Sequence, residues 1–167
     1  MSRLCEISLR LVAPRWHSIY TFPAGTELRK GRRGGHYWPL RKAARGVHSK
    51  HGCYSWSVGG KVHYVGSFSP YAKEEFHTGL EGRVHNYFQN HGSGERPNTN
   101  RWVFEKLGES MVSNDVILSH LQFEGADLGE ERLSFEDVSL DKSLVLAIEA
   151  LLIAQCKFRG ECQWNRT

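Results

Sequence analysis

One carboxylate in the sequence stands out for the chemistry it could perform. Glu149 is the single charged residue within the apolar run LVLAIEALLIA. Burying an unpaired carboxylate costs free energy, so such a residue is paired with a cation, bound to a metal ion, or exposed along a narrow stripe of its helix. The run by itself leaves these three alternatives open, and the metal-ligand alternative needs partners from elsewhere in the chain.

Two tyrosines that could serve as partners lie on a predicted β-hairpin. Two runs rich in strand-forming residues flank a Gly-Gly pair within residues 52–68, which is typical of a hairpin. A three-residue loop sorts polar and apolar side chains onto opposite faces better than a two-residue loop does. That register pairs Tyr54 with Gly66 and Trp56 with Tyr64. It therefore predicts that both tyrosines lie on one face of the sheet.

A cation and a third phenol follow on a predicted helix. A capping-box pattern at 78–81 begins the helix, and Gly92 is its expected end. Arg83, Tyr87 and His91 recur every four residues and form one row on the helix surface, beside an apolar row. This row is either a solvated helix face or a means of bringing a guanidinium and a phenol to a site.

The rest of the chain predicts a mixed α/β (α+β) fold that positions these side chains. Alternating residues indicate further strands, and apolar residues at helical spacing indicate further helices. The acidic stretch 124–137 is expected to be a loop or an insertion. The expected strands cover 4–12, 16–22 and 115–123, and the expected helices cover 100–107 and 139–156.

Composition and charge limit the classes of protein to which this chain can belong. The chain has 167 residues, of which 40% are hydrophobic, enough for one domain with a core. No apolar run approaches the roughly 18 residues of a membrane span. Four scattered cysteines form no CxxC pair, so we expect reduced thiols. Residues 1–51 carry eleven lysines and arginines against two acids, which indicates a nucleic-acid partner or a solvated basic face.

The order of these features resembles that of the GIY-YIG endonuclease family. The features that carry the resemblance are GCY at 52–54, YVG at 64–66, Arg83 on a helix, Glu149 on an apolar helix, and Asn165 near the C-terminus. The resemblance implies that residues 51–167 form a GIY-YIG nuclease core, a small central antiparallel sheet flanked by helices. Residues 1–50 would be a basic N-terminal extension that contacts DNA, within a single compact domain overall.

The resemblance also implies roles for individual residues. Tyr54 and Tyr64 match the two motif tyrosines, and Cys53 stands where the first motif has isoleucine. Arg83 matches the arginine that contacts the scissile phosphate. Glu149 matches the carboxylate that holds the divalent metal, Mg²⁺ or Mn²⁺, one ion per site. The other implied site residues are Lys73, Tyr87, where many members have histidine, and Asn165.

Hydrolysis of a phosphodiester requires a set of this kind. A water must be activated, the charge that develops on the phosphate neutralised, and the leaving oxygen stabilised. We expect Tyr64, near Lys73, Arg83 and the metal, to have a pKa below its ordinary value of about 10, so that its phenolate accepts the proton of the water. Tyr54 would orient the water or the phosphate, and the reverse assignment stays open.

The implied function is that of a Mg²⁺-dependent, site-specific endonuclease of double-stranded DNA, similar to small stand-alone type II restriction enzymes. Such enzymes act as homodimers on palindromic sites in the prokaryotic or phage cytoplasm, without a membrane, and a cognate DNA methyltransferase is a candidate partner. The alternatives are a structure-specific or phage-encoded repair or degradative nuclease, and a non-catalytic DNA-binding module. The residues expected to contact DNA are Arg29, Lys30, Arg32, Arg33, Asn98, Asn100 and Arg101.

Overall fold

A computed structural model describes most of the chain. The described residues are 9–29, 35–47, 51–69, 79–88, 99–128, 131–134 and 142–166. Several predicted site residues lie outside these ranges, and their predictions stay untested. They are Lys30, Arg32, Arg33, Lys73 and Asn98.

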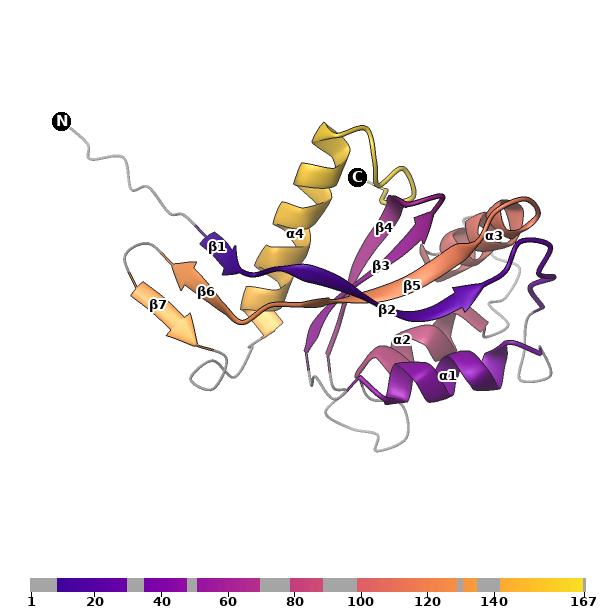
Figure 1. The fold of residues 1–167 in the computed structure, drawn as a ribbon, viewed down its shortest axis with the longest axis horizontal. Helices are drawn as coiled ribbons and strands as arrows, with labels where there is room; N and C mark the ends of the chain where they lie inside the picture. Colours follow the sequence, from indigo (N-terminus) through magenta and orange to yellow (C-terminus); the bar gives the residue numbers. More distant parts are fainter. Residues whose placement is uncertain are drawn as a thin grey trace.

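A four-stranded antiparallel sheet forms the centre of the molecule (Figure 1). Its strands follow the order β2-β5-β3-β4, so strands from both halves of the chain are interleaved. Their bounds are β2 (Arg15–Phe22), β3 (Gly52–Val58), β4 (Lys61–Phe68) and β5 (Val116–Gln122). The strands expected at 16–22 and 115–123 and the hairpin at 52–68 are thus confirmed.

The hairpin between β3 and β4 differs from its prediction at the turn. Both pairings that involve the tyrosines are confirmed, but Val58 pairs with Lys61, so the expected three-residue loop is wrong. Gly59 and Gly60 both have positive φ, which suits the two-residue turn that matches strand twist. A bulge after Trp56 then restores the tyrosine register.

Helices cover both faces of this sheet (Figure 1). One face packs against α1 (Tyr37–Arg45), α2 (Gly79–Phe88) and α3 (Thr99–Met111), and the other against α4 (Lys142–Phe158). The prediction of a mixed fold with an antiparallel sheet and flanking helices is confirmed at this level. Among the described residues, no helix is long and apolar enough to cross a membrane.

Residues before position 50 contribute directly to the central core. β2 pairs with β5, and α1 packs against α2. Tyr37 and Leu40 of α1 are 1% and 0% exposed and join the same apolar cluster as Trp56, whereas Trp38 is exposed. Among the described residues, therefore, position 50 is not a boundary between two packing units, because the sheet is completed by a strand from the basic segment.

A second, smaller sheet lies beside the first in Figure 1. It joins β1 (Leu9–Val12), β6 (Gly125–Leu128) and β7 (Glu131–Ser134) in the antiparallel order β1-β6-β7. The expected loop at 124–137 is therefore wrong at β6 and β7, whereas the alternative of an insertion stays a prediction. Backbone pairing of β6 with β1 on one side and β7 on the other stabilises two short strands whose sequences have little strand propensity of their own.

Candidate active site

Three tyrosines meet on the face of the sheet covered by α2. Tyr54 and Tyr64 lie on β3 and β4 with ring centroids 6.0 Å apart, and the Tyr87 ring of α2 lies 6.5 Å from that of Tyr54. The hydroxyls of Tyr54 and Tyr87 share a hydrogen bond. All three rings are at least nine-tenths buried. The helix row and the hairpin thus bring the three phenols together.

The absence of a side chain at Gly66 makes room for this cluster. Gly66 pairs with Tyr54 across the hairpin, and the ring of Tyr54 lies directly over it. A Cβ at this position would lie 2.8 Å from Cε1, Cζ and the hydroxyl oxygen of Tyr54. The glycine of the second motif is therefore required for the close approach of the Tyr54 ring, a steric role that was not predicted.

Replacing Gly66 with alanine is expected to displace Tyr54 and break its hydrogen bond to Tyr87. Overpacking of this kind lowers the free energy of unfolding by about 1–3 kcal/mol, measurable by chemical denaturation. Gly108→Ala is the matched control, because Gly108 lies within α3 with open space where a Cβ would be. That control should be neutral or slightly stabilising. Equal effects of the two substitutions would contradict the steric explanation.

Arg83 and Glu149 contact the same residue of β4 from opposite faces of the sheet. Nε of Arg83, on α2, donates a hydrogen bond of 2.9 Å to the backbone carbonyl of Ser67. The hydroxyl of Ser67 donates one of 2.7 Å to Oε2 of Glu149, on α4. A single residue of β4 thus joins the predicted phosphate-binding arginine to the predicted metal ligand. Ser67 was not predicted, and its place on the α4 face follows only from the hairpin register.

The electrostatics of the site differ from the expectation for Tyr64. Burial raises the pKa of Tyr64, whereas the neighbouring hydroxyls of Tyr87 and Tyr54 and the charge of Arg83 act to lower it. The expected lowering of this pKa is therefore wrong for the protein alone, because burial dominates. Burial raises the pKa values of Tyr54 and Tyr87 well above their ordinary value. Tyr64 is consequently the phenol of the three that ionises most readily.

Glu149 is half-buried and keeps part of its hydrogen-bonding capacity. One oxygen accepts from Ser67, and no ion pair joins this carboxylate to a cation among the described residues. Its charge contributes to raising the pKa of Tyr64. Burial raises the pKa of Cys53 to about 12, and the charge of Glu149 is the second, smaller cause. Cys53 itself is buried against α4, as expected for a small apolar residue. Of the three alternatives for Glu149, the ion pair is thus not observed.

Asn165 holds the C-terminal segment against β4. Its side-chain amide donates to the carbonyl of Val65 and accepts from the amide of the same residue, at 2.7 and 2.9 Å. Backbone bonds from Cys162 and Trp164 to the same strand extend this contact. Asn165 therefore fixes the residue that follows Tyr64, and its position is structural support.

The residues that were predicted to contact DNA and that the structure describes lie on elements other than those that carry the candidate active site. Arg29 is exposed and forms an ion pair with Glu27. Arg101 pairs with Glu105 along α3, where Asn100 is half-buried. These three candidates thus come from the segment after β2 and from α3, whereas the phenols, Arg83 and Glu149 come from the hairpin, α2 and α4.

At the outer strand β4, the protein combines three kinds of reactive group. A guanidinium can bind an anion, a carboxylate can bind a hard cation, and a phenol can exchange a proton. No family model, curated protein or solved structure matches the chain significantly.

Proposed function

We propose that the protein is a metal-dependent endonuclease that hydrolyses phosphodiester bonds of double-stranded DNA. The observation that supports this function is the convergence of Tyr64, Arg83 and Glu149 on β4, from three elements far apart in the sequence. A solvated helix face or plain sheet packing would not require these groups to meet. Phosphodiester hydrolysis does require an anion-binding cation, a metal ligand and a proton acceptor in one place.

The residues present fit a divalent cation of the Mg²⁺ or Mn²⁺ type. Glu149 offers a carboxylate that has one hydrogen-bond partner and no neutralising cation among the described residues. Within the same part of the chain, no group of three or more His, Cys, Asp or Glu side chains gathers. A single carboxylate suits Mg²⁺, which keeps several waters and binds phosphate oxygens. When bound, such an ion lowers the pKa of water and withdraws charge from the phosphate.

Arg83 is placed to bind the scissile phosphate. Its side chain is exposed, and Nε is anchored by the Ser67 carbonyl. The two terminal nitrogens make no hydrogen bond with the described residues, so they are available to phosphate oxygens. Anchoring one edge of the guanidinium fixes the direction of the other. Arg83 thus holds the phosphate beside Glu149.

Tyr64 acts as the proton acceptor in this proposal. Its phenolate is stabilised by the neighbouring hydroxyls of the tyrosine cluster, which share one hydrogen bond between Tyr54 and Tyr87, and by the charge of Arg83. Tyr54 shares a hydrogen bond with Tyr87 and is more deeply buried than Tyr64, so it orients the cluster rather than taking a proton itself.

The finer proposal is a type II restriction enzyme that acts as a homodimer on a palindromic site. Cleavage of both strands by a chain with one site favours two copies related by a two-fold axis. The outer side of α4 offers a surface for the second copy, because its exposed positions between Ser143 and Phe158 carry no charge. These positions are Leu146, Ala147, Ala150, Leu151, Ala154, Gln155 and Phe158.

Leu151→Lys is expected to convert the dimer into a monomer. A lysine at the centre of an apolar helix pair would be desolvated without a partner. Light scattering coupled to size-exclusion chromatography measures the mass directly. Val112→Lys changes another exposed apolar residue, at the end of α3, and should leave the dimer intact. A wild-type protein that stays monomeric with and without DNA would contradict this interface.

Digestion of a plasmid of known sequence tests the proposed function. We expect discrete fragments with Mg²⁺, no cleavage with EDTA, and recovery of cleavage when Mg²⁺ or Mn²⁺ is added back. Mapping of the fragment ends then gives the site and the cut position. A smear or cleavage confined to branched substrates would favour the repair or degradative nuclease instead. Binding without cleavage under all metal conditions would favour the DNA-binding module.

A further inference from the structure

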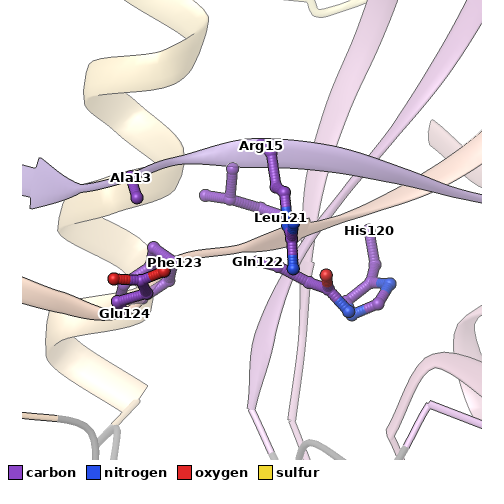
Figure 2. A pocket seen from close by; sticks show the side chains of 7 residues that line it. All are labelled: Ala13, Arg15, His120, Leu121, Gln122, Phe123 and Glu124. Carbon is purple, nitrogen blue, oxygen red and sulfur yellow. The ribbon is translucent and has the colours of Figure 1, made fainter.

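A cavity of about 380 Å³ lies where β2 and β5 run side by side, at the end where they leave the sheet toward β1 and β6 (Figure 2). None of the residues assigned to hydrolysis lines it. Its walls combine a cation, an imidazole, an amide, a carboxylate and apolar groups. The lining residues are Ala13, Arg15, His120, Leu121, Gln122, Phe123 and Glu124.

The position of His120 connects this cavity to the face that bears the phenols. His120 pairs directly with Tyr54 between β5 and β3, so the two side chains lie on the same face of the sheet. Neighbouring strands are about 4.8 Å apart. In the order β2-β5-β3-β4, β5 lies two and β2 three spacings from β4, so the cavity between them lies roughly 10–15 Å from β4. Nucleotides of one DNA strand rise by about 3.4 Å, so this distance corresponds to about three to four nucleotides.

His120 is a neutral hydrogen-bonding group in this wall. The residue is 8% exposed, and its Nδ1 is buried without a hydrogen-bond partner among the described residues. Burial is the main cause that lowers the pKa of His120, and the charge of the nearby His17 lowers it further. A buried lone pair is less costly than a buried unpaired N–H when the other nitrogen can reach a partner, so the proton belongs on Nε2. The ring thus offers an N–H on its accessible side.

The other polar groups point to a base edge rather than a phosphate. Arg15 and Gln122 pair across β2 and β5, so their side chains lie next to each other on the cavity wall, as Figure 2 shows. Glu124 adds an exposed carboxylate to the cavity wall, and its negative charge disfavours the binding of an anion there. A mixture of donors and acceptors matches the edges of nucleobases, which guanidinium, amide and carboxylate groups read in protein–DNA complexes.

We propose that this cavity binds a nucleobase of the DNA, about three to four nucleotides from the phosphate held by Arg83. The location relative to the phosphate rests on the proposed nuclease function, whereas base binding by the cavity does not. The sheet would then carry two separate sites along its width. Hydrolysis takes place at β4, and recognition of a base takes place at β2 and β5.

Titration of the full-length protein with single nucleotides tests base binding without cleavage. The probes are dAMP, dGMP, dCMP and dTMP, with 2-deoxyribose 5-phosphate as the probe that lacks a base, all in EDTA. Histidine ring signals are followed by NMR. At least one nucleotide is expected to shift the His120 signal in a saturable way, with a dissociation constant of about 1–10 mM for so few contacts. His63 on β4, whose Nδ1 is also buried without a partner among the described residues, serves as the internal control and should not shift.

A substitution in the cavity wall provides a second test of base binding. Arg15→Ala alters an exposed residue and should raise the dissociation constant of the bound nucleotide at least about fivefold. Arg10→Ala alters an exposed arginine on β1 outside the cavity and should leave it unchanged. No shift with any nucleotide, an equal shift with the base-free phosphate, or equal affinity in Arg15→Ala would overturn the base site. These results would leave plasmid cleavage unaffected, and loss of plasmid cleavage alone would reject only the nuclease function.

Discussion

Replacing Glu149 with glutamine is expected to abolish DNA cleavage while DNA binding is retained. The amide has the same shape and can still accept the hydrogen bond from Ser67, but it lacks the charge that binds a hard cation. The loss of metal-dependent stabilisation corresponds to a fall of at least about 10³-fold in the cleavage rate. Cleavage kinetics with Mg²⁺ and binding assays in EDTA measure the two properties separately.

Glu109→Gln provides the matched control for this substitution. Glu109 is an exposed carboxylate on α3 that pairs with Lys106, so its loss removes the same charge away from the site. Its cleavage rate should equal that of the wild type. Ser67→Ala should show an intermediate loss of about 10–100-fold, because the hydroxyl orients Glu149 without binding metal itself. A Glu149→Gln protein that cuts at the wild-type rate would remove the carboxylate from the mechanism.

The central elements of the site could be predicted because local patterns specify them. Strand-forming runs around two glycines predict the hairpin, and a four-residue period predicts the helix row of Arg83 and Tyr87. The pairing of Trp56 with Tyr64 also follows from sorting polar and apolar side chains. These features depend on residues near one another in the sequence, so a single sequence contains enough information.

Contacts that depend on tertiary packing could not be predicted in the same way. Ser67 joins Glu149 across 82 positions, and that contact needs both the hairpin register and the packing of α4. The helix α1 was missed, although Tyr37, Leu40 and Ala44 have helical spacing. Its strongly basic surroundings favoured an exposed element, whereas a buried ion pair between Arg41 and Glu81 joins it to α2. Similarly, the pKa of Tyr64 depends on burial, which the sequence does not specify.

Tyr64→Phe is expected to reduce cleavage by about 10²–10⁴-fold, the usual contribution of a proton acceptor. The substitution keeps the ring in the core and removes only the hydroxyl. Because the pKa of Tyr64 is raised above its ordinary value of about 10, the phenolate is scarce at neutral pH. The wild-type rate should therefore rise by about tenfold per pH unit between about pH 7 and pH 9, and this slope should disappear in Tyr64→Phe.

Two further phenylalanine substitutions distinguish the roles of the tyrosines. Tyr20→Phe removes a phenol from the same face at β2, where it contacts His36, and should leave both rate and pH slope unchanged. Tyr54→Phe removes a donor to the cluster, so the rate should fall while the slope remains. If instead Tyr54→Phe abolished the slope and Tyr64→Phe kept it, the proton acceptor would be Tyr54. The slope decides between them because only the group that ionises can produce it, whereas either substitution can lower the rate.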